Sequence, residues 1–291
     1  MACYPMAFEE KMRALLGDEA AAFFHALQQQ SVHGLRINPV KTTAGAFEKR
    51  ACFALSPVPW CAEGFYLEDA LQRPGKHPYH EAGVYYLQDP SAMSAVELLA
   101  PQPGETVLDL CAAPGGKSTQ IAAKIGPEGL LMANEIHPAR AKQLSQNIER
   151  LGFGNTVVTC ETPEKLAGRF AGFFDRVLVD APCSGEGMFR KNEQAEKHWS
   201  QENVLFCAER QQDVLHRAAE MLKPGGFLLY STCTFAPEED EGTLARFLQT
   251  HPSFALVQRE QPYFSPGRPD WIETDLPSVS RAFRLWPHKL R

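Results

Sequence analysis

Residues 106–117 read TVLDLCAAPGGK, and this stretch decides the fold. The apolar run from Thr106 to Cys111 predicts a buried strand, and the Ala-Ala-Pro-Gly-Gly that follows predicts a tight turn into a helix ending near Ile125. Glycines at such a turn let a ligand approach the backbone, because no Cβ blocks it. The stretch is therefore a candidate ligand-binding loop.

Strands and helices alternate downstream of this loop. We expect strands over 129–135, 156–160, 176–180, 227–233 and 254–258, and helices over 139–151, 202–223 and 238–250. Pro224-Gly-Gly is expected to stop the second of these helices. The alternation predicts an α/β fold, a Rossmann-like doubly wound parallel sheet made of right-handed βαβ units. Ligands of such sheets bind at the carboxyl ends of the strands.

The segment before this region has a different pattern. Helical spacing of apolar residues predicts a helix over 7–30, and a short strand over 34–39 ends at Pro39. Four prolines between residues 57 and 78 indicate a loop-rich region. We place a domain boundary at 77/78, which gives a small N-terminal α/β domain (1–77) and a larger domain (78–291). Asp89-Pro90 predicts an N-cap followed by proline at the first helical position.

Composition excludes several classes of protein. The chain has 291 residues, with 44% hydrophobic and 22% charged residues, which is typical of globular domains and not of disorder. Its apolar stretches are far shorter than the roughly 20 residues of a membrane span. The N-terminus has no signal-peptide pattern, so we expect a cytoplasmic protein. The net charge of −6 does not decide for or against a nucleic-acid partner, because it ignores how charge is distributed.

The eight cysteines and nine histidines show no metal-ligand spacing, so no metal is predicted. Glu135 follows Gly116 by 19 residues, where a carboxylate can accept hydrogen bonds from ribose hydroxyls. The loop lacks a full G-x-G-x-x-G, so a dinucleotide is not implied. S-adenosylmethionine is the leading candidate ligand. The alternative is a turn that only packs a helix on a strand.

Two cysteines lie at the ends of successive predicted strands. Cys183 follows Asp180-Ala-Pro, and Cys233 follows Ser231-Thr, so both are expected at the sheet edge that carries the ligand loop. A buried structural role is the alternative for either thiol. Methylation at carbon 5 of a pyrimidine needs such an arrangement, because that carbon becomes nucleophilic only after a thiolate adds to carbon 6. A carboxylic acid near the ring nitrogen promotes the addition, and a second group removes the carbon 5 proton.

At these residues the chain resembles the Sun/Nop family of RNA 5-methylcytosine methyltransferases, and is most similar to its bacterial branch that modifies 16S ribosomal RNA. The resembling segments span nearly the whole chain: Arg36-Ile-Asn-Pro, Gln88-Asp-Pro-Ser-Ala-Met93, residues 108–117, Asp180-Ala-Pro-Cys-Ser-Gly185, Tyr230-Ser-Thr-Cys-Thr-Phe235 with Pro237-Glu-Glu, and Arg284-Leu-Trp-Pro-His288.

The resemblance implies a role for each matching residue. Cys233 would be the nucleophile on carbon 6, Cys183 would assist proton removal and product release, and Asp180 would contact the cofactor region and the cytosine. Lys117 would hold the catalytic loop. S-adenosylmethionine would be bound by Cys111, Ala112, Ala113, Pro114, Gly115, Gly116, Lys117, Glu135 and Asp180. The fold would be the class I methyltransferase sheet, over 78–291, with an RNA-binding N-terminal domain.

The sequence departs from the family pattern in two places. Where relatives have an aspartate for the adenine amino group, this chain has Thr162 beside Glu161, and we assign neither. Relatives also continue beyond the position of Arg291 into a last sheet strand and a C-terminal RNA-binding domain, so we expect a truncated chain here. The resemblance implies a ribosomal RNA substrate, and we expect a monomer that uses no metal or membrane.

Basic residues follow the Asp-Ala-Pro-Cys segment. Arg190, Lys191 and Lys197 interleave with Phe189 and Trp199, which suits an RNA backbone and a splayed base. A solvated loop with two rim aromatics explains the pattern equally well. Arg36, Lys41, Lys49 and Arg50 are expected to be ordinary surface, and the alternative is that they form a second basic face.

Two other functions remain as alternatives. A methyltransferase acting on an amino group is disfavoured, because such enzymes use an (Asp/Asn)-Pro-Pro-aromatic loop where this chain has Asp-Ala-Pro-Cys. A non-catalytic ribosome-assembly factor that retains the fold would gain nothing from the two thiols.

Overall fold

The computed structural model describes residues 4–69 and 73–290. The chain forms two compact units, one of residues 1–31, 181–216 and 231–291, and one of residues 32–180 and 217–230. The division of the sequence at 77/78 stays a prediction. Each unit is described by itself below.

A five-stranded sheet is the centre of the second unit. Its order is β7-β6-β5-β8-β9, and the pairs β5·β6, β5·β8 and β6·β7 are parallel. The strands are β5 (Thr106–Asp109), β6 (Leu130–Asn134), β7 (Thr156–Thr159), β8 (Phe174–Asp180) and β9 (Leu222–Ser231). Most apolar residues of β5, β6 and β8 are buried, as expected of the covered strands of a parallel sheet, whereas Val157 of β7 and Phe227 of β9 are exposed. The predicted doubly wound sheet is confirmed.

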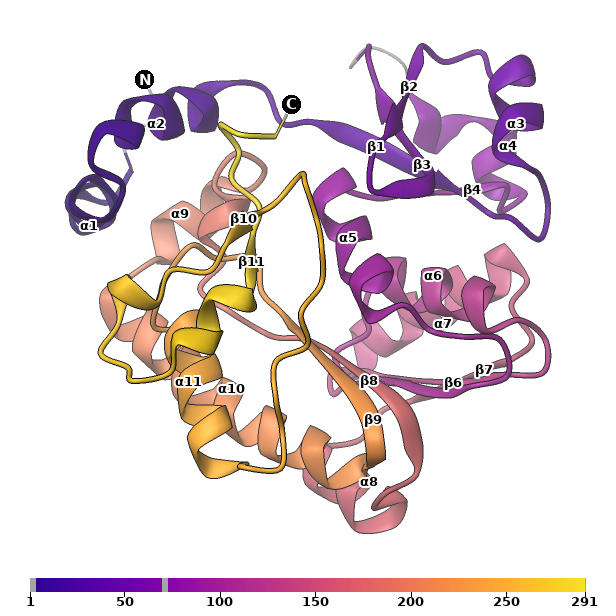
Figure 1. Cartoon of the computed structure of the whole chain (residues 1–291). Helices are drawn as coiled ribbons and strands as arrows, with labels where there is room; N and C mark the ends of the chain where they lie inside the picture. Colours follow the sequence, from indigo (N-terminus) through magenta and orange to yellow (C-terminus); the bar gives the residue numbers. More distant parts are fainter. Residues whose placement is uncertain (1–3, 70–72, 291) are drawn as a thin grey trace. The chain divides into compact units, whose positions relative to one another are not determined.

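Helices cover the two faces of this sheet. Figure 1 shows α6 (Gly116–Ile125) and α7 (Pro138–Leu151) along one face and α8 (Pro163–Phe170) along the other. Gly152 ends α7 with a φ of +84°, the left-handed conformation that glycine adopts without strain. α5 (Pro90–Leu99) begins as predicted, since Asp89 accepts a hydrogen bond from the Ser91 N–H and Pro90 occupies the first turn.

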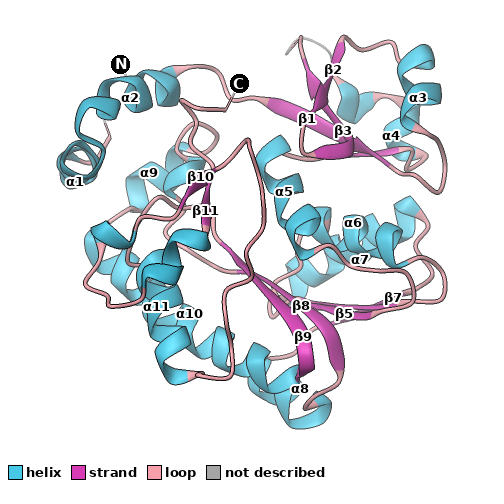
Figure 2. Cartoon of the chain, in the orientation of Figure 1, coloured by secondary structure: helices cyan, strands magenta, loops and turns pink. Residues whose placement is uncertain are grey.

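A smaller antiparallel sheet, order β2-β3-β1-β4, belongs to the same unit. Its elements are β1 (His33–Ile37), α3 (Ala44–Arg50), β2 (Leu55–Val58), β3 (Cys61–Leu67), η2 (Pro74–Lys76), α4 (Pro78–Glu81) and β4 (Tyr85–Leu87), drawn by type in Figure 2. The prediction of a loop-rich region around Pro57 and Pro59 was wrong. Pro57 lies in β2, at the edge of the sheet and next to a register shift, where a missing N–H is tolerated.

The other unit begins with two helices where one was predicted over 7–30. α1 (Met6–Leu16) ends at Gly17, whose φ of +54° breaks the helix, and a short 3-10 turn, η1 (Gly17–Glu19), leads into α2 (Ala20–Gln28). The remaining elements are η3 (Glu186–Met188), α9 (Glu193–His198), α10 (Gln201–Met221), α11 (Glu241–Thr250), β10 (Ser265–Pro266), η4 (Pro269–Trp271), η5 (Pro277–Arg281) and β11 (Phe283–Arg284), of which α10 continues into the second unit.

Two boundaries differ from the sequence prediction. Residues 254–258 form no strand, and the chain pairs later, between β10 and β11. α10 ends at Met221 and β9 begins at Leu222, so Pro224-Gly-Gly lies inside the strand that it was expected to precede. Gly225, with a φ of +79°, absorbs the bend there.

Candidate active site

The ligand loop connects β5 to α6 and is shaped by its glycines. Gly115 is the N-cap residue of α6 and has a φ of +111°, which L side chains rarely adopt. A Cβ there would lie 3.1 Å from Cδ1 of Leu144 on α7. On the other side, a Cβ at Gly116 would lie 3.3 Å from the Tyr86 ring. Both positions therefore leave little room for a side chain.

Hydrogen bonds from α7 hold the loop from one side. Arg140 donates to the Ala113 carbonyl at 2.9 Å, and Asn147 donates to the Pro114 carbonyl at 2.8 Å. Fixing these carbonyl oxygens fixes the path of the loop backbone. The loop is thus held in shape by protein groups before any ligand binds.

Arg36 holds the loop from the other side, and the expectation that it is surface was wrong. It is 2% exposed, and its guanidinium donates to the Gly116 carbonyl at 3.0 Å, to Thr119 Oγ1 at 2.8 Å and to Gln88 Oε1 at 2.8 Å. Burial lowers its pKa to about 10, so it stays charged at neutral pH. Its neighbours Leu35 and Ile37 project to the opposite face of β1, so the sequence carried no local signal that Arg36 is buried.

Two carboxyl groups of the loop region differ in environment. Asp109, at the end of β5, is buried and accepts a hydrogen bond from Ser118 at 2.7 Å, and burial raises its pKa to about 7. Asp180, at the end of β8, is about a third exposed, and its Oδ2 lies 2.6 Å from Nζ of Lys117. The predicted residues Lys117 and Asp180 are thus brought together as an ion pair.

Glu135 follows β6 directly and is buried. Its Oε1 accepts a hydrogen bond from the His137 N–H at 3.0 Å, and its Oε2 lies 3.1 Å from Arg140 Nη1. Each carboxylate oxygen can accept a second hydrogen bond, so the group keeps capacity for a ligand. Asn134, which sequence reasoning missed, ties the strand ends together by donating to the carbonyls of Leu110 and Glu161.

The position after β7 remains without a clear ligand group. Thr162 is the N-cap of α8, where its hydroxyl accepts a hydrogen bond from the Lys165 N–H. Glu161 pairs with Lys165 Nζ at 3.0 Å and is about a third exposed. The Thr162 hydroxyl is therefore already used by the helix, which leaves Glu161 as the more available acceptor of the two.

The two predicted cysteines lie together in the first unit. Their sulfurs are 3.3 Å apart, and the Cys183 sulfur also accepts from the Cys233 backbone N–H at 3.4 Å. The side chain of Cys233 is exposed and that of Cys183 half-buried, and the cysteines within the described residues form no disulfide. The hydrogen bond to Cys233 and burial raise the pKa of Cys183 well above its usual value.

Backbone contacts hold the Cys233 segment in place. The Gly187 N–H donates to the Cys233 carbonyl at 2.8 Å, and a Cβ on Gly187 would lie 2.7 Å from that oxygen. Glu186, which is fully buried, accepts from the Phe235 N–H at 2.9 Å and from the Trp199 indole at 3.0 Å. Glu186 was not among the predicted site residues, because a lone glutamate in a Gly-rich segment carries no pattern.

The aromatic residues beside Cys183 do not lie on a rim. Phe189 and Trp199 are 5% and 8% exposed and pack with Phe8 of α1, so both readings of this segment, base stacking and rim aromatics, were wrong. Lys191 and Lys197 are exposed, and Arg190 donates to the Ala26 carbonyl at 3.4 Å. The basic side chains of the segment remain candidates for contact with RNA.

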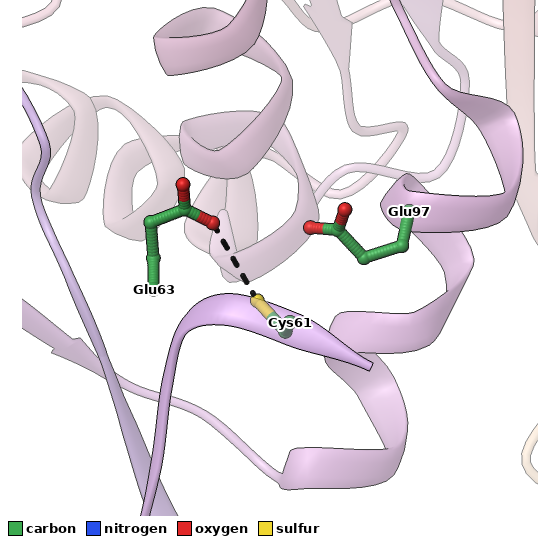
Figure 3. A group of neighbouring side chains, drawn as sticks. All are labelled: Cys61, Glu63 and Glu97. Atoms are coloured by element: carbon green, nitrogen blue, oxygen red, sulfur yellow. Dashed lines mark hydrogen bonds between the residues drawn. The ribbon is translucent and has the colours of Figure 1, made fainter. Parts of the chain in front are cut away.

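A second group of polar side chains lies near β3 (Figure 3). The ligand atoms of Cys61, Glu63 and Glu97 are within 4.8 Å of one another. Burial raises the pKa of Cys61 to about 12, which keeps the thiol protonated. Gln120 and Lys124 each lie 2.9 Å from a Glu97 oxygen, so the carboxylate is already satisfied. We assign no metal to this group.

Comparison with known proteins identifies the family. Residues 96–290 match the family model described as 16S rRNA methyltransferase RsmB/F, and residues 4–90 match the N-terminal domain of 16S rRNA methyltransferase RsmF. The chain belongs to the RsmB/F family. The resemblance to Sun/Nop enzymes seen in the sequence is confirmed.

Relatives in the same family are similar over most of this chain. Ribosomal RNA small subunit methyltransferase F of Vibrio parahaemolyticus is 42% identical over 246 residues, which cover 81% of this chain and 52% of that protein. The enzyme of the same name from Pectobacterium atrosepticum is 39% identical over 259 residues, 85% of this chain and 53% of that protein. The chain spans about half the length of the curated relatives it matches.

Solved structures share the fold. A methyltransferase homolog protein from Pyrococcus horikoshii has a TM-score of 0.87 at 29% identity, covering 99% of this chain and 92% of its own. NSun6 from the same organism, solved with SFG, has a TM-score of 0.85 at 20% identity, covering 98% and 95%. The fold is thus the class I fold of S-adenosylmethionine-dependent methyltransferases with an RsmF-type N-terminal domain, and the cofactor predicted from the loop is that of the family. Among the described residues, no helix is both long and apolar enough to span a membrane.

Proposed function

We propose that this chain transfers a methyl group from S-adenosylmethionine to carbon 5 of a cytosine in 16S ribosomal RNA, through a covalent thiol adduct. The observation that carries the proposal is the pair of sulfurs, 3.3 Å apart, with Cys183 half-buried and Cys233 exposed. Membership of the RsmB/F family supports the ribosomal RNA substrate. The names of the relatives from Vibrio and Pectobacterium agree with it.

The cofactor would be held by residues of one unit, Cys111 to Lys117 with Glu135 and Asp180. These residues fit a nucleoside cofactor, because Gly115 and Gly116 carry no side chain at the strand-to-helix turn and Glu135 keeps acceptor capacity for ribose hydroxyls. When bound, S-adenosylmethionine supplies an electrophilic methyl carbon. Glu161 would accept from the adenine amino group, since the Thr162 hydroxyl caps α8.

Cys233 would form the bond to the base. Its thiolate adds to carbon 6 of cytosine, and the electron pair of the C5–C6 double bond makes carbon 5 nucleophilic toward the methyl group. A hydrogen bond from the Cys183 thiol stabilises negative charge on the Cys233 sulfur, which favours the reactive thiolate. The exposure of Cys233 suits attack on a base flipped out of its stack.

Cys183 would act after methyl transfer. It assists removal of the proton from carbon 5, and the electrons of that C–H bond restore the C5–C6 double bond and expel the Cys233 thiolate. For this step Cys183 first gives its own proton to water. Its pKa, raised by the hydrogen bond with Cys233 and by burial, makes the resulting thiolate a strong base, and the carbon 5 proton then restores the thiol.

Asp180 and Lys117 would donate a proton to the ring nitrogen N3 of the cytosine. The Lys117 ammonium lies 2.6 Å from the Asp180 carboxylate, which orients the carboxyl and gives the pair a proton to deliver to N3 as the thiolate adds. Only two residues separate Asp180 from Cys183 in the sequence, so the extended backbone limits their Cα separation to about 11 Å. That limit supports a common role for the ion pair and the thiols.

The binding partner would be the small ribosomal subunit. The protein would act as a monomer in the cytoplasm and would need no metal. We propose that residues 1–77 bind RNA and that 78–291 form the catalytic domain. Lys191, Lys197 and Arg190 would contact phosphates next to the thiols.

The proposal is tested by incubating the protein with tritiated S-adenosylmethionine and small ribosomal subunits that lack the modification. Digestion of the labelled RNA to nucleosides should place the tritium in 5-methylcytidine. Label in N4-methylcytidine would instead support an amino methyltransferase, and RNA binding without label would support an assembly factor. Either result would overturn the proposed reaction.

A further inference from the structure

Two buried side chains of the same unit form hydrogen bonds to the backbone before and after Cys183. Glu239 accepts a hydrogen bond from the Ser184 N–H at 2.9 Å, and Gln211 of α10 donates to the Pro182 carbonyl at 3.1 Å. The same amide of Gln211 donates to Glu239 at 2.9 Å. The residues before and after Cys183 are therefore tied to a single Glu–Gln pair.

Glu239 and Gln211 are both fully buried, which is uncommon for polar side chains. A buried carboxylate is costly unless donors surround it. The donors to Glu239 include the Ser184 backbone N–H and the Gln211 amide, which also donates to the Pro182 carbonyl. The contacts engage backbone groups, so they fix the direction in which Cys183 projects its thiol. That direction brings the sulfur within 3.3 Å of Cys233.

We propose that Glu239 and Gln211 are positioning residues. Together they form a clamp on the backbone around Cys183, which holds its thiol next to the Cys233 sulfur. The catalytic meaning of the clamp rests on the proposed function, whereas the clamp itself acts in the protein alone. Without it, the Cys183 segment can rotate, and the thiol no longer donates to the Cys233 sulfur. Cys233 would then lose the hydrogen bond that stabilises its thiolate.

Several ionisable groups act on the sulfur pair. Besides Cys233 and burial, the negative charge of Glu239 raises the pKa of Cys183. Glu186 adds negative charge next to Glu239, which raises the pKa of Glu239 together with burial, against the hydrogen bonds from Ser184 and Gln211. Although the side chain of Lys191 is exposed, partial desolvation lowers its pKa, and negative charge on Cys233 opposes that shift. Removing the negative charge of Glu239 should therefore lower the pKa of Cys183.

The test is the rate of alkylation of Cys183 by iodoacetamide as a function of pH, resolved by peptide mass spectrometry. Cys233→Ala serves as the background, so that Cys183 titrates without its thiol partner. Adding Glu239→Gln, which keeps an acceptor for the Ser184 N–H but removes the charge, should lower the midpoint by about one pH unit. Adding Gln211→Ala, which frees the Pro182 carbonyl, should raise the alkylation rate at the high-pH plateau about threefold.

Glu238→Gln is the matched control. Glu238 precedes Glu239 in the chain but pairs with Lys11 and Gln201, so this variant should keep the midpoint and plateau of the background. A midpoint in Glu239→Gln equal to that of the control, together with an unchanged plateau in Gln211→Ala, would overturn the clamp. Because alkylation needs neither RNA nor cofactor, failure of the proposed methylation would leave this result readable.

Discussion

The sulfurs of Cys183 and Cys233 lie 3.3 Å apart although 50 positions separate the two residues in the chain. One sulfur receives a hydrogen bond from the other residue's own backbone N–H, so the pair is locked by main chain as well as by side chain. The proposed mechanism gives the two thiols different tasks, because the pKa of the half-buried Cys183 is raised and Cys233 is exposed. The division of roles is the basis of the predictions below.

Gly187→Ala should displace Cys233. The added Cβ would lie 2.7 Å from the Cys233 carbonyl oxygen, closer than such contacts allow, so the segment must shift. We expect methylation to fall at least about tenfold and the free energy of unfolding to fall by about 1–3 kcal/mol. RNA methylation assays and urea denaturation would measure both. Gly154→Ala, where a Cβ meets nothing within 4 Å, should change neither, and equal activity of the two variants would contradict the geometry.

Lys117→Met should slow the chemical step more than it weakens binding of S-adenosylmethionine. The change removes the ammonium that lies 2.6 Å from Asp180, and with it the proton source for the ring nitrogen. We expect kcat to fall about a hundredfold, as for loss of a general acid. The control is Lys124→Met on the same helix, since Lys124 pairs with Glu97 instead. A similar kcat in the two variants would remove Lys117 from the mechanism.

Arg36→Met should lower both the free energy of unfolding and the affinity for S-adenosylmethionine. The substitution leaves the Gly116 carbonyl, Thr119 and Gln88 without their shared donor, at an expected cost of about 3 kcal/mol. Because Gly116 belongs to the ligand loop, calorimetry should also detect a weaker affinity for S-adenosylmethionine. Arg50→Met, at an exposed position, is the comparison. An affinity loss no larger than that of Arg50→Met would show that Arg36 does not shape the loop.

Asp109→Asn should remove part of the pH dependence of stability. Burial raises the pKa of Asp109 to about 7 in the folded state, against an unfolded value of 3.8. The folded protein therefore holds a proton that the unfolded chain releases, and stability contributed below pH 4 is lost as pH rises to 7. The upper bound of this loss is about 4 kcal/mol. Relative to wild type, the variant should gain stability between these pH values, and a constant difference would mean that Asp109 titrates normally.

The α/β core could be predicted from the sequence because its signals are local. The turn at Gly115 and Gly116, the cap at Asp89 and the glycine after α7 each depend on a few neighbouring residues, and each appears where predicted. The pairing of Cys183 with Cys233 followed from topology, since successive parallel strands end at one edge. Whether that edge also carries the ligand loop stays a prediction.

Residues whose environment is set by tertiary packing were misjudged. Phe189 and Trp199 look like a basic-aromatic RNA motif, yet they are buried with Phe8, which lies about 180 positions away in the chain and is not detectable by spacing. Arg36 looked like surface because arginine usually is, but its three acceptors come from other segments. Glu239 was hidden in an acidic run whose members have different partners.

A covalent trapping experiment tests the thiol mechanism most directly. Cys183→Ala, incubated with S-adenosylmethionine and unmethylated 16S ribosomal RNA, should accumulate a protein–RNA adduct that survives denaturing electrophoresis, because Cys233 adds to the base and cannot be released. The Cys183→Ala, Cys233→Ala double variant should form none. A folded, RNA-binding Cys183→Ala protein that yields no adduct, or an adduct that persists without Cys233, would contradict the assignment of the two sulfurs.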